Sequence, residues 1–336
     1  MKKNIIKILF FFLFVNILFT NPSIIFAKDV YLGGDSVGIE MNKNGVIISG
    51  TYDLVIDNKI YNPSKEAIIK IGDVIVKSNN NNVSNSKDFI TSLVDIQDSS
   101  LNLIIKRNSK TINTSIKIVK NGSSIKTGLY LKDKILGVGT LTYYDPETNN
   151  YGALGHEIID SDTNQIFNDF DGYITDSEVD GYKKSENGNP GSKIATLDTD
   201  DKLGNILINT QYGIYGQYSE TPSSRLISTA SIDEVHKGYA QIATVLEGDK
   251  IEYYDINIIK LEKQKEISTK GITFEVIDEE LLDKTNGIIQ GMSGSPIIQD
   301  DKLIGAVTHV ITNDVKCGYG IYIDFMIKIS NSIYTE

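Results

Sequence analysis

Gly291-Met-Ser-Gly-Ser-Pro296 is the most informative stretch of this chain, because two glycines surround a serine shortly before a proline. The apolar pair Ile297 and Ile298 follows, as expected for a buried strand. Glycine adopts backbone angles that other residues avoid and lets a ligand approach the main chain closely. The stretch therefore predicts a tight turn that presents the Ser293 hydroxyl outward. The alternative is a Gly/Ser hairpin that carries no chemistry.

This turn resembles the Gly-x-Ser-Gly-Gly-Pro turn of chymotrypsin-like peptidases. In such a turn the backbone N–H groups of Gly291 and Ser293 point into one small space, which can hold the oxyanion of a tetrahedral intermediate. Ser295 stands where that motif has a second glycine, so Ser293 is favoured as the nucleophile and Ser295 is the alternative. An α/β-hydrolase elbow would instead need glycine two residues after the serine, followed by a helix.

A serine hydroxyl needs a base to become a nucleophile, and the chain contains three histidines. His236 lies in a charged segment typical of a surface, and His309 follows the serine in the chain. His156 ends the stretch Tyr151-Gly-Ala-Leu-Gly-His156 and precedes the serine, which is the order found in chymotrypsin-like triads. His156 is therefore the predicted general base.

The acid that would orient the imidazole is less well defined. Asp278 follows a strand-like run over 272–277 and lies between His156 and Ser293, which keeps the order His, Asp, Ser. Spacing makes Asp278 the best of several candidates. The candidates are Glu157, Asp160, Asp278, Glu279 and Glu280.

Residues 1–27 have the layout of a secretory leader. Lys2 and Lys3 precede an apolar run that extends from Ile8 to Phe19, and Ala27 is a candidate cleavage position. The run is short for a bilayer span, which takes about 20 residues. We expect export across a membrane, after which the leader is either removed or kept as an anchor.

Composition sets further limits on function. The 336 residues leave room for about two domains after a leader. The formal net charge of −11 argues against nucleic-acid binding, which needs basic patches to neutralise phosphates. Cys317 is the single cysteine, and no Cys/His pair has the spacing of metal ligands. We therefore expect no metal site, and acyl transfer by Ser293 and His156 needs neither a metal nor an organic cofactor.

The segment 28–120 alternates short apolar strands with polar turns and has a helix signal after Ser86. Its order resembles a PDZ domain of the bacterial protease-associated kind, through Leu32-Gly-Gly-Asp-Ser-Val-Gly-Ile39 and Ile71-Gly-Asp-Val-Ile-Val76. That resemblance implies a loop whose amides bind a peptide carboxylate and an edge to which the peptide adds as a strand. The alternative is a simple glycine turn. The candidate loop residues are Gly33, Gly34 and Gly38.

The remainder, 121–336, contains many short strand-like runs separated by Gly, Asn and Asp turns, which suggests a sandwich or a barrel. Long loops are expected within 161–205, because this part is polar and rich in Gly and Asp. The predicted fold is mainly β: a chymotrypsin-like double β-barrel peptidase domain over 121–336, preceded by a small PDZ-like α+β domain over 28–120.

Taken together, the motifs resemble the SpoIVB peptidases (stage IV sporulation protein B) of endospore-forming bacteria, over nearly the whole chain after the leader. The segments that carry this resemblance are Tyr151-Gly-Ala-Leu-Gly-His156, Gly188-Asn-Pro-Gly191, Gly287-Ile-Ile-Gln-Gly-Met-Ser-Gly-Ser-Pro-Ile-Ile298, Ile304-Gly-Ala-Val-Thr-His-Val310 and Gly318-Tyr-Gly320.

The resemblance implies a serine peptidase that the forespore secretes into the space between the two spore membranes. It implies self-cleavage, in which the PDZ domain takes part. It also implies cleavage of the membrane-anchored regulator of an intramembrane protease, which releases processing of the late mother-cell sigma factor. The family's catalytic residues fall on His156, Asp278 and Ser293, and Thr308 and His309 lie on the strand beside the substrate. The alternatives are a PDZ scaffold with a decayed protease domain and a hydrolase that acts on esters.

Overall fold

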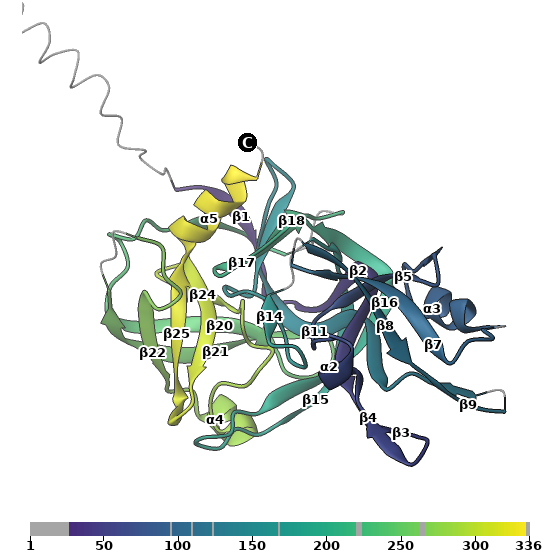
Figure 1. Ribbon diagram of the computed structural model, residues 1–336. Coiled ribbons are helices and arrows are strands. Elements are labelled where there is room, and N and C mark those ends of the chain that lie inside the picture. The colour runs from purple at the N-terminus through teal and green to yellow at the C-terminus, as the bar shows by residue number, and fades with distance from the viewer. Residues whose placement is uncertain are drawn as a thin grey trace, which may run out of the picture.

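The computed structural model describes residues 27–94, 96–108, 110–122, 124–166, 169–219, 224–262 and 266–333. The described chain is built mostly from β-strands and a few short helices. Figure 1 shows three parts side by side: a C-terminal barrel on the left, a second barrel in the middle and a small module on the right. The predicted leader and its cleavage position lie outside or at the limit of the described residues.

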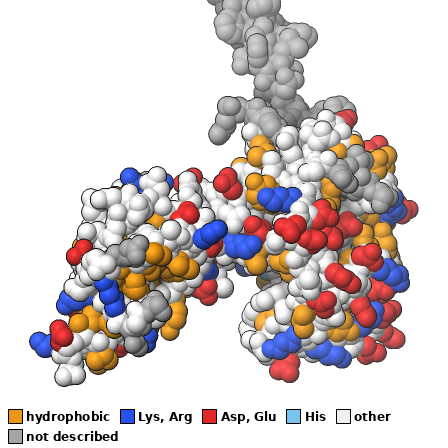
Figure 2. Space-filling model, turned by 90° about the vertical axis from the view of Figure 1, so that its right-hand side faces the viewer, with side chains coloured by type: hydrophobic (Ala, Val, Ile, Leu, Met, Phe, Trp, Pro, Cys, Tyr) orange, Lys and Arg blue, Asp and Glu red, His pale blue; other side chains and the backbone are white. Residues whose placement is uncertain are grey.

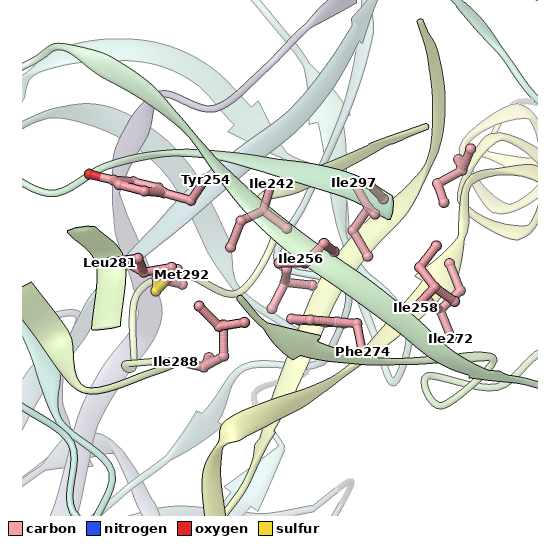
Figure 3. Close-up of a cluster of buried hydrophobic side chains, with 14 of the residues drawn as sticks. Ile242, Tyr254, Ile256, Ile258, Ile272, Phe274, Leu281, Ile288, Met292 and Ile297 are labelled. Atoms are coloured by element: carbon pink, nitrogen blue, oxygen red, sulfur yellow. The ribbon is translucent and has the colours of Figure 1, made fainter. Parts of the chain in front are cut away.

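Six strands of the C-terminal part close into a barrel. In the ring, β20 pairs with β21, β21 with β22, β22 with β25, β25 with β24, β24 with β23, and β23 returns to β20. Alternate apolar side chains point inward, so Ile256 and Phe274 are fully buried in the centre of the core in Figure 3. The strands are β20 (Gly238–Val245), β21 (Ile251–Leu261), β22 (Ile272–Val276), β23 (Pro296–Gln299), β24 (Lys302–Ile311) and β25 (Asp314–Tyr322).

A second ring precedes it in the chain. Strand β2 lies between β11 and β15, β12 lies between β11 and β18, and β16 pairs with β15. A bridge from Gly204 of β16 to Tyr218 next to β18 completes the ring. These two rings confirm the prediction of a mainly β fold built on barrels. The strands are β2 (Ser36–Thr51), β11 (Leu129–Asp145), β12 (Asn150–Ala153), β15 (Asp171–Lys183), β16 (Ser192–Ile206) and β18 (Gly213–Gln217).

The polar part of the chain between 161 and 205 forms a long antiparallel hairpin of β15 and β16, where the sequence had suggested loops. Its side chains alternate between buried and exposed positions, so the strands are polar because one face meets water. The hairpin reaches helix α4 (Glu279–Thr285), where the Ser185 amide donates to the carbonyl of Thr285 over 2.9 Å. It therefore connects the first barrel to the second.

The small module has its own core, centred on residues such as Ile48, Ile75, Phe89 and Leu103. Helix α3 begins after Asn85, whose side chain accepts from the Asp88 amide, so the N-cap lies one residue before the predicted one. The elements are β3 (Leu54–Ile56), β4 (Lys59–Tyr61), α2 (Pro63–Glu66), β5 (Val74–Ser78), β6 (Asn81–Asn82), α3 (Ser86–Leu93), β7 (Ser100–Arg107), β8 (Lys110–Lys117), β9 (Val119–Asn121) and β10 (Ser124–Lys126).

This module is inserted into the first barrel and does not precede it. The first half of β2 contributes Val37 and Ile39 to the barrel core, and the second half contributes Val46 and Ile48 to the module core. Strand β11 returns the chain from the module to the barrel. The sequence predicted a domain boundary near residue 120. In the structure β2 and β11 each run continuously from the first barrel into the module, so these two strands join the parts that the boundary would separate.

The glycines predicted to bind a peptide carboxylate are buried at the first barrel. The amides of Gly33 and Gly34 donate to the carbonyls of Thr142 and Leu141, at 3.0 and 2.8 Å. Gly38 lies within β2, between β11 and β15. These amides are already bonded and both edges of the strand are occupied, so the loop assignment made from the PDZ resemblance is not supported here.

The remaining elements cover the barrels. Strand β1 pairs with β11 on one side and with β19 on the other. Strand β19 also pairs with β24. None of the helices in the described ranges is long and apolar enough to cross a membrane. On the face shown in Figure 2, acidic side chains gather over the larger lobe and Lys and Arg are scattered. These elements are β1 (Asp29–Leu32), β13 (Ile159–Asp160), β14 (Gln165–Ile166), β17 (Ile208–Thr210), β19 (Leu226–Thr229) and α5 (Ile323–Ser332).

Candidate active site

His156 and Ser293 face one cavity of about 810 Å³. His156 comes from the loop after β12 of the first barrel, and Ser293 comes from the turn before β23 of the second. Strands β11 and β24 supply further walls. The two residues that the sequence singled out are thus 137 positions apart in the chain and share one cleft.

The turn that carries His156 requires an unusual backbone. Leu154 and Gly155 follow β12 with φ of +68° and +69°. The left-handed conformation is strained for leucine, and burial of its side chain holds it in place. A Cβ on Gly155 would lie 2.8 Å from the Thr308 methyl group, so glycine lets this loop pack directly on β24. The turn therefore brings His156 close to the second barrel.

A backbone carbonyl fixes the His156 ring. Nδ1 lies 2.8 Å from the carbonyl oxygen of Glu157, which can only accept, so Nδ1 carries the proton and Nε2 has a free lone pair. Burial lowers the pKa of His156 from its ordinary value, while the carbonyl and the charge of Glu157 oppose that shift. The ring is thus neutral near neutral pH, as a general base must be.

The Ser293 turn is anchored on both sides. Met292 is fully buried and points into the second barrel beside Leu281 and Ile288 in Figure 3. On the other side Gly294 has φ of +94°, and a Cβ there would lie 2.0 Å from the carbonyl oxygen of Thr140 in β11. The turn is thus held between the two barrels, and any side chain at Gly294 would force them apart.

The Ser293 hydroxyl donates to the carbonyl of Thr308 over 2.9 Å. A register shift in the pairing of β24 with β25 occurs at Thr308, and such a bulge turns groups away from the ladder. For Ser293 to act as the predicted nucleophile, its hydroxyl would have to rotate from this carbonyl toward Nε2 of His156. Catalytic hydrogen bonds often form only when substrate is bound.

Ser295, the alternative nucleophile, is fully buried. Its hydroxyl has no hydrogen-bond partner among the described residues. It is not part of the cavity lining that includes Ser293. The geometry therefore favours Ser293 over Ser295, as expected from the resemblance of the turn.

The amides of Gly291 and Ser293 donate to no acceptor within the described ranges. The carbonyl of Gln290 accepts from the Lys193 amide at 2.9 Å, and the carbonyl of Met292 accepts from the Ser295 amide at 3.0 Å. A trans peptide group points its N–H opposite to its C=O. Both carbonyls are bonded within the protein, so both N–H groups point away from those bonds, as an oxyanion site requires.

The model of a protein family described as SpoIVB peptidase S55 matches residues 123–327, which is more than half of the chain. The chain belongs to the SpoIVB peptidase S55 family. It is therefore a serine peptidase and acts on protein or peptide substrates. No curated protein matches this S55 peptidase significantly in sequence.

Two solved structures of the Rv3671c protease from M. tuberculosis resemble the S55 peptidase in part. The active form has 12% identity and a TM-score of 0.34, covering 59% of this chain and 74% of that one. An inactive serine-to-alanine mutant has 11% identity and a TM-score of 0.32, covering 58% and 82%. Similarities this low do not bear on the activity of the S55 peptidase.

Asp278 of the S55 peptidase does not hydrogen-bond to His156, as the predicted role of a triad acid would require. It is the N-cap of α4: one carboxylate oxygen accepts from the Leu281 amide at 2.9 Å and the other from the Asp255 amide at 3.2 Å. Among the described residues, no carboxylate hydrogen-bonds to His156. Of the other candidates, Asp160 pairs with Lys132, Glu280 pairs with Lys284, and Glu157 contributes its carbonyl.

We expect Asp278→Asn to keep kcat within about threefold of wild type, because asparagine caps helices as well as aspartate does. Asp278→Ala should lower the free energy of unfolding by about 1 kcal/mol, since it removes the cap. Steady-state kinetics and urea unfolding of both variants measure these effects. A triad acid would behave differently, because its amide variant loses about 10⁴-fold in kcat. A loss of that size in Asp278→Asn would contradict the capping role.

His309 stacks against His156 of the S55 peptidase, with ring centroids 5.0 Å apart and a tilt of 39°. Burial, followed by the charges of His156 and Lys270, lowers the pKa of His309 to about 4, so the ring is neutral. The two rings also border a smaller cavity of about 340 Å³. Thr308 is buried and its hydroxyl donates to the Thr269 carbonyl, so only its backbone faces Ser293.

Proposed function

We propose that this protein is a self-cleaving endopeptidase in which Ser293 is the nucleophile, His156 is the general base and the Gly291 and Ser293 amides bind the oxyanion. The observation that carries this proposal is the meeting of the Ser293 hydroxyl, the His156 ring and two unbonded amides at one cavity. A decayed scaffold has no need to keep these amides unbonded. The same geometry favours acyl transfer without a metal or an organic cofactor.

The reaction runs in two halves. Nε2 of His156 takes the Ser293 proton as Oγ attacks the substrate carbonyl carbon, and the Gly291 and Ser293 amides stabilise the negative oxygen. His156 then gives the proton to the leaving amine as the peptide bond breaks. In the second half, His156 takes a proton from water as the water oxygen attacks the acyl carbon, and it gives that proton to the Ser293 oxygen as the ester bond breaks. The Glu157 carbonyl keeps the proton on Nδ1 throughout.

Substrate binding also activates the nucleophile in this proposal. The Thr308 carbonyl that holds the Ser293 hydroxyl is a natural acceptor for a substrate N–H. A substrate that takes this carbonyl releases the hydroxyl toward His156. The cavity lining is mixed: it includes charged residues such as Lys132 and Asp162, and also the apolar residues Ile288, Val307 and Val310, which are close in sequence to Ser293 or to Thr308. We therefore propose an apolar side chain on the residue before the scissile bond.

The biological role is proposed from the family. SpoIVB peptidases act in sporulation signalling, and the sequence resemblance supports cleavage of a membrane-anchored regulator of an intramembrane protease. It also supports export into the space between the forespore and mother-cell membranes, in line with the leader pattern of residues 1–27. A peptide-binding role of the inserted module would have to use surfaces other than the buried glycines at 33, 34 and 38.

Intact mass over time tests self-cleavage directly. Wild-type protein and Ser293→Ala are incubated side by side after purification. We expect only the wild type to shorten, into discrete products whose ends report the preferred cleavage sites. If neither protein shortens, even with added membrane-anchored regulator ectodomains, the proposal of self-cleavage is rejected.

The value of kcat/KM should fall as the pH is lowered. The midpoint of this fall should lie below about 6.5, which is the ordinary pKa of histidine. His156 acts only when neutral, and burial lowers its pKa, so a lower pH is needed to protonate it. The profile of kcat/KM between pH 4 and pH 8 measures this midpoint. A midpoint clearly above 6.5 would show that the base is charged near neutrality, in conflict with a buried His156.

A further inference from the structure

Lys193 is a buried lysine that the mechanism has not yet used. It lies in β16, and its Nζ bonds to the hydroxyls of Thr140 and Thr244 at 3.3 and 3.0 Å. No carboxylate pairs with it in the described part of the chain. Burial lowers the pKa of Lys193 to about 7. An unpaired amine is unfavourable inside a protein, so its retention calls for an explanation.

The backbone of Lys193 is joined to the nucleophile turn. Its amide donates to the carbonyl of Gln290 at 2.9 Å, and the Gln290 amide donates to the Gly191 carbonyl at 2.8 Å. The first of these bonds fixes the peptide group between Gln290 and Gly291. If this peptide flipped, the bond would break and the Gly291 amide would turn away from the cavity.

The side chain of Lys193 reaches the same turn by a second route. The Lys193 amine can only donate, so the Thr140 hydroxyl accepts from it. The hydroxyl proton of Thr140 is then free to bond to another acceptor. That proton goes to the carbonyl of Gly291 at 2.8 Å. The Thr140 amide donates to the carbonyl of Ser293 at 3.0 Å. The relay from Nζ through the Thr140 hydroxyl therefore holds the Gly291 carbonyl, and the backbone of the same threonine holds the Ser293 carbonyl.

The stem of Lys193 also fills the space beneath the turn. A Cβ on Gly291 would lie 3.0 Å from both Cγ and Cδ of Lys193. The turn thus rests on the lysine chain, and its glycine permits this close approach. Backbone, stem and amine act together on a few residues of one loop.

We propose that Lys193 is a positioning residue that sets the geometry of the oxyanion site through the Gln290 carbonyl and the Thr140 hydroxyl. This inference rests on the proposed assignment of the Gly291 and Ser293 amides as that site. Lys193 does not touch substrate. Its backbone fixes the Gln290–Gly291 peptide group, which exposes the Gly291 N–H to the cavity, and its amine, through Thr140, fixes the next peptide group, whose Met292 N–H donates to the Ile289 carbonyl.

Lys193→Met tests the role of the amine, because methionine keeps most of the stem and leaves the backbone bond intact. The probe is succinyl-Ala-Ala-Pro-Leu-p-nitroanilide. Removing an oxyanion donor outright lowers kcat by about 10²- to 10³-fold, so loosening one should lower kcat by about tenfold or more. We expect KM to stay within about twofold. The melting temperature should not fall, because the substitution removes a buried amine that no carboxylate pairs with in the described structure.

A double-mutant cycle separates the relay from general packing. Thr140→Val breaks the relay at its second link, so adding it to Lys193→Met should give little further loss of kcat. Thr244→Val is the matched control: it removes the other partner of Nζ but leaves the relay intact, and should keep kcat within about threefold.

Unchanged kcat in Lys193→Met would overturn the proposal. The proposal would also be overturned if the loss of kcat were matched by an equal loss of folded protein. The amount of folded protein is measured as the fraction of molecules that a fluorophosphonate labels. Ser293→Ala, measured with the same p-nitroanilide, distinguishes failure of the Lys193 proposal from failure of the proposed function. If Ser293→Ala still cleaves the anilide, the site assignment itself is rejected, whatever Lys193→Met does.

Discussion

Replacing Ser293 with alanine should lower kcat by about 10⁶-fold, leaving only the residual rate that oxyanion binding alone supports. The Ser293 hydroxyl is the one that both lies in the nucleophile turn and faces the cavity with His156. Alanine fits the turn, because only the hydroxyl contact with Thr308 is lost. The melting temperature should therefore remain close to that of the wild type. Cleavage of the p-nitroanilide, together with a thermal melt, measures both effects.

Ser295→Ala is the matched control for this result. Its hydroxyl is buried without a partner in the described structure, so its removal should leave kcat within about threefold and stability equal or slightly higher. The two serines are two positions apart in the same turn, which makes the comparison stringent. An inactive Ser295→Ala beside an active Ser293→Ala would reverse the assignment of the nucleophile.

His156→Gln should produce a loss of kcat of the same order, about 10⁶-fold, because nucleophile and base act as a unit. Glutamine can still donate to the Glu157 carbonyl but cannot take a proton from Ser293. Adding Ser293→Ala to His156→Gln should therefore cost almost nothing more. Steady-state kinetics of the two single variants and the double variant test this non-additivity.

His236→Gln serves as the control for the base. His236 is exposed, and its Nε2 lies 2.7 Å from Asp300 on the surface of the second barrel. It does not border the cavity that holds Ser293. We expect wild-type kcat from this variant. If instead His236→Gln were inactive and His156→Gln active, His156 would not be the base.

Local signals in the sequence were enough to find His156 and Ser293, which face one cavity in the structure. Gly291, Gly294 and Gly155 are needed at positive φ or at close contacts, so the glycines around Ser293 and His156 report real backbone requirements. Such requirements act over a few residues and are therefore visible in one sequence. The assignment of these residues to catalysis remains for the variants above to test.

Asp278 shows where reasoning from chain order fails. Spacing along the chain does not say how far the end of β22 lies from the end of β12, which belongs to another barrel. A different signal was present: an aspartate followed by Glu279 and Glu280 and then leucines is typical of a helix start. That signal matches the capping role seen in α4.

Two further features left little trace in the sequence. Asn42-Lys-Asn44 has the composition of a turn, but it forms the partly exposed middle of the continuous strand β2, so its composition gives no sign that the module is inserted. Lys193 looks like an ordinary surface lysine, because nothing in its neighbours reveals that β16 carries it beneath the nucleophile turn. Both depend on contacts between segments that are distant in the chain.

The interleaving of module and barrel also fixes an order of events during synthesis. Residues 45–131 can bury their own core as soon as they have emerged, whereas Asp29 of β1 must wait for Ser228, its partner in β19. The Ser293 turn then needs β24 and β25 to close the last barrel. A chain that has not yet been made as far as β25 therefore has no assembled cleft, and the enzyme cannot cut its neighbours before that strand has emerged.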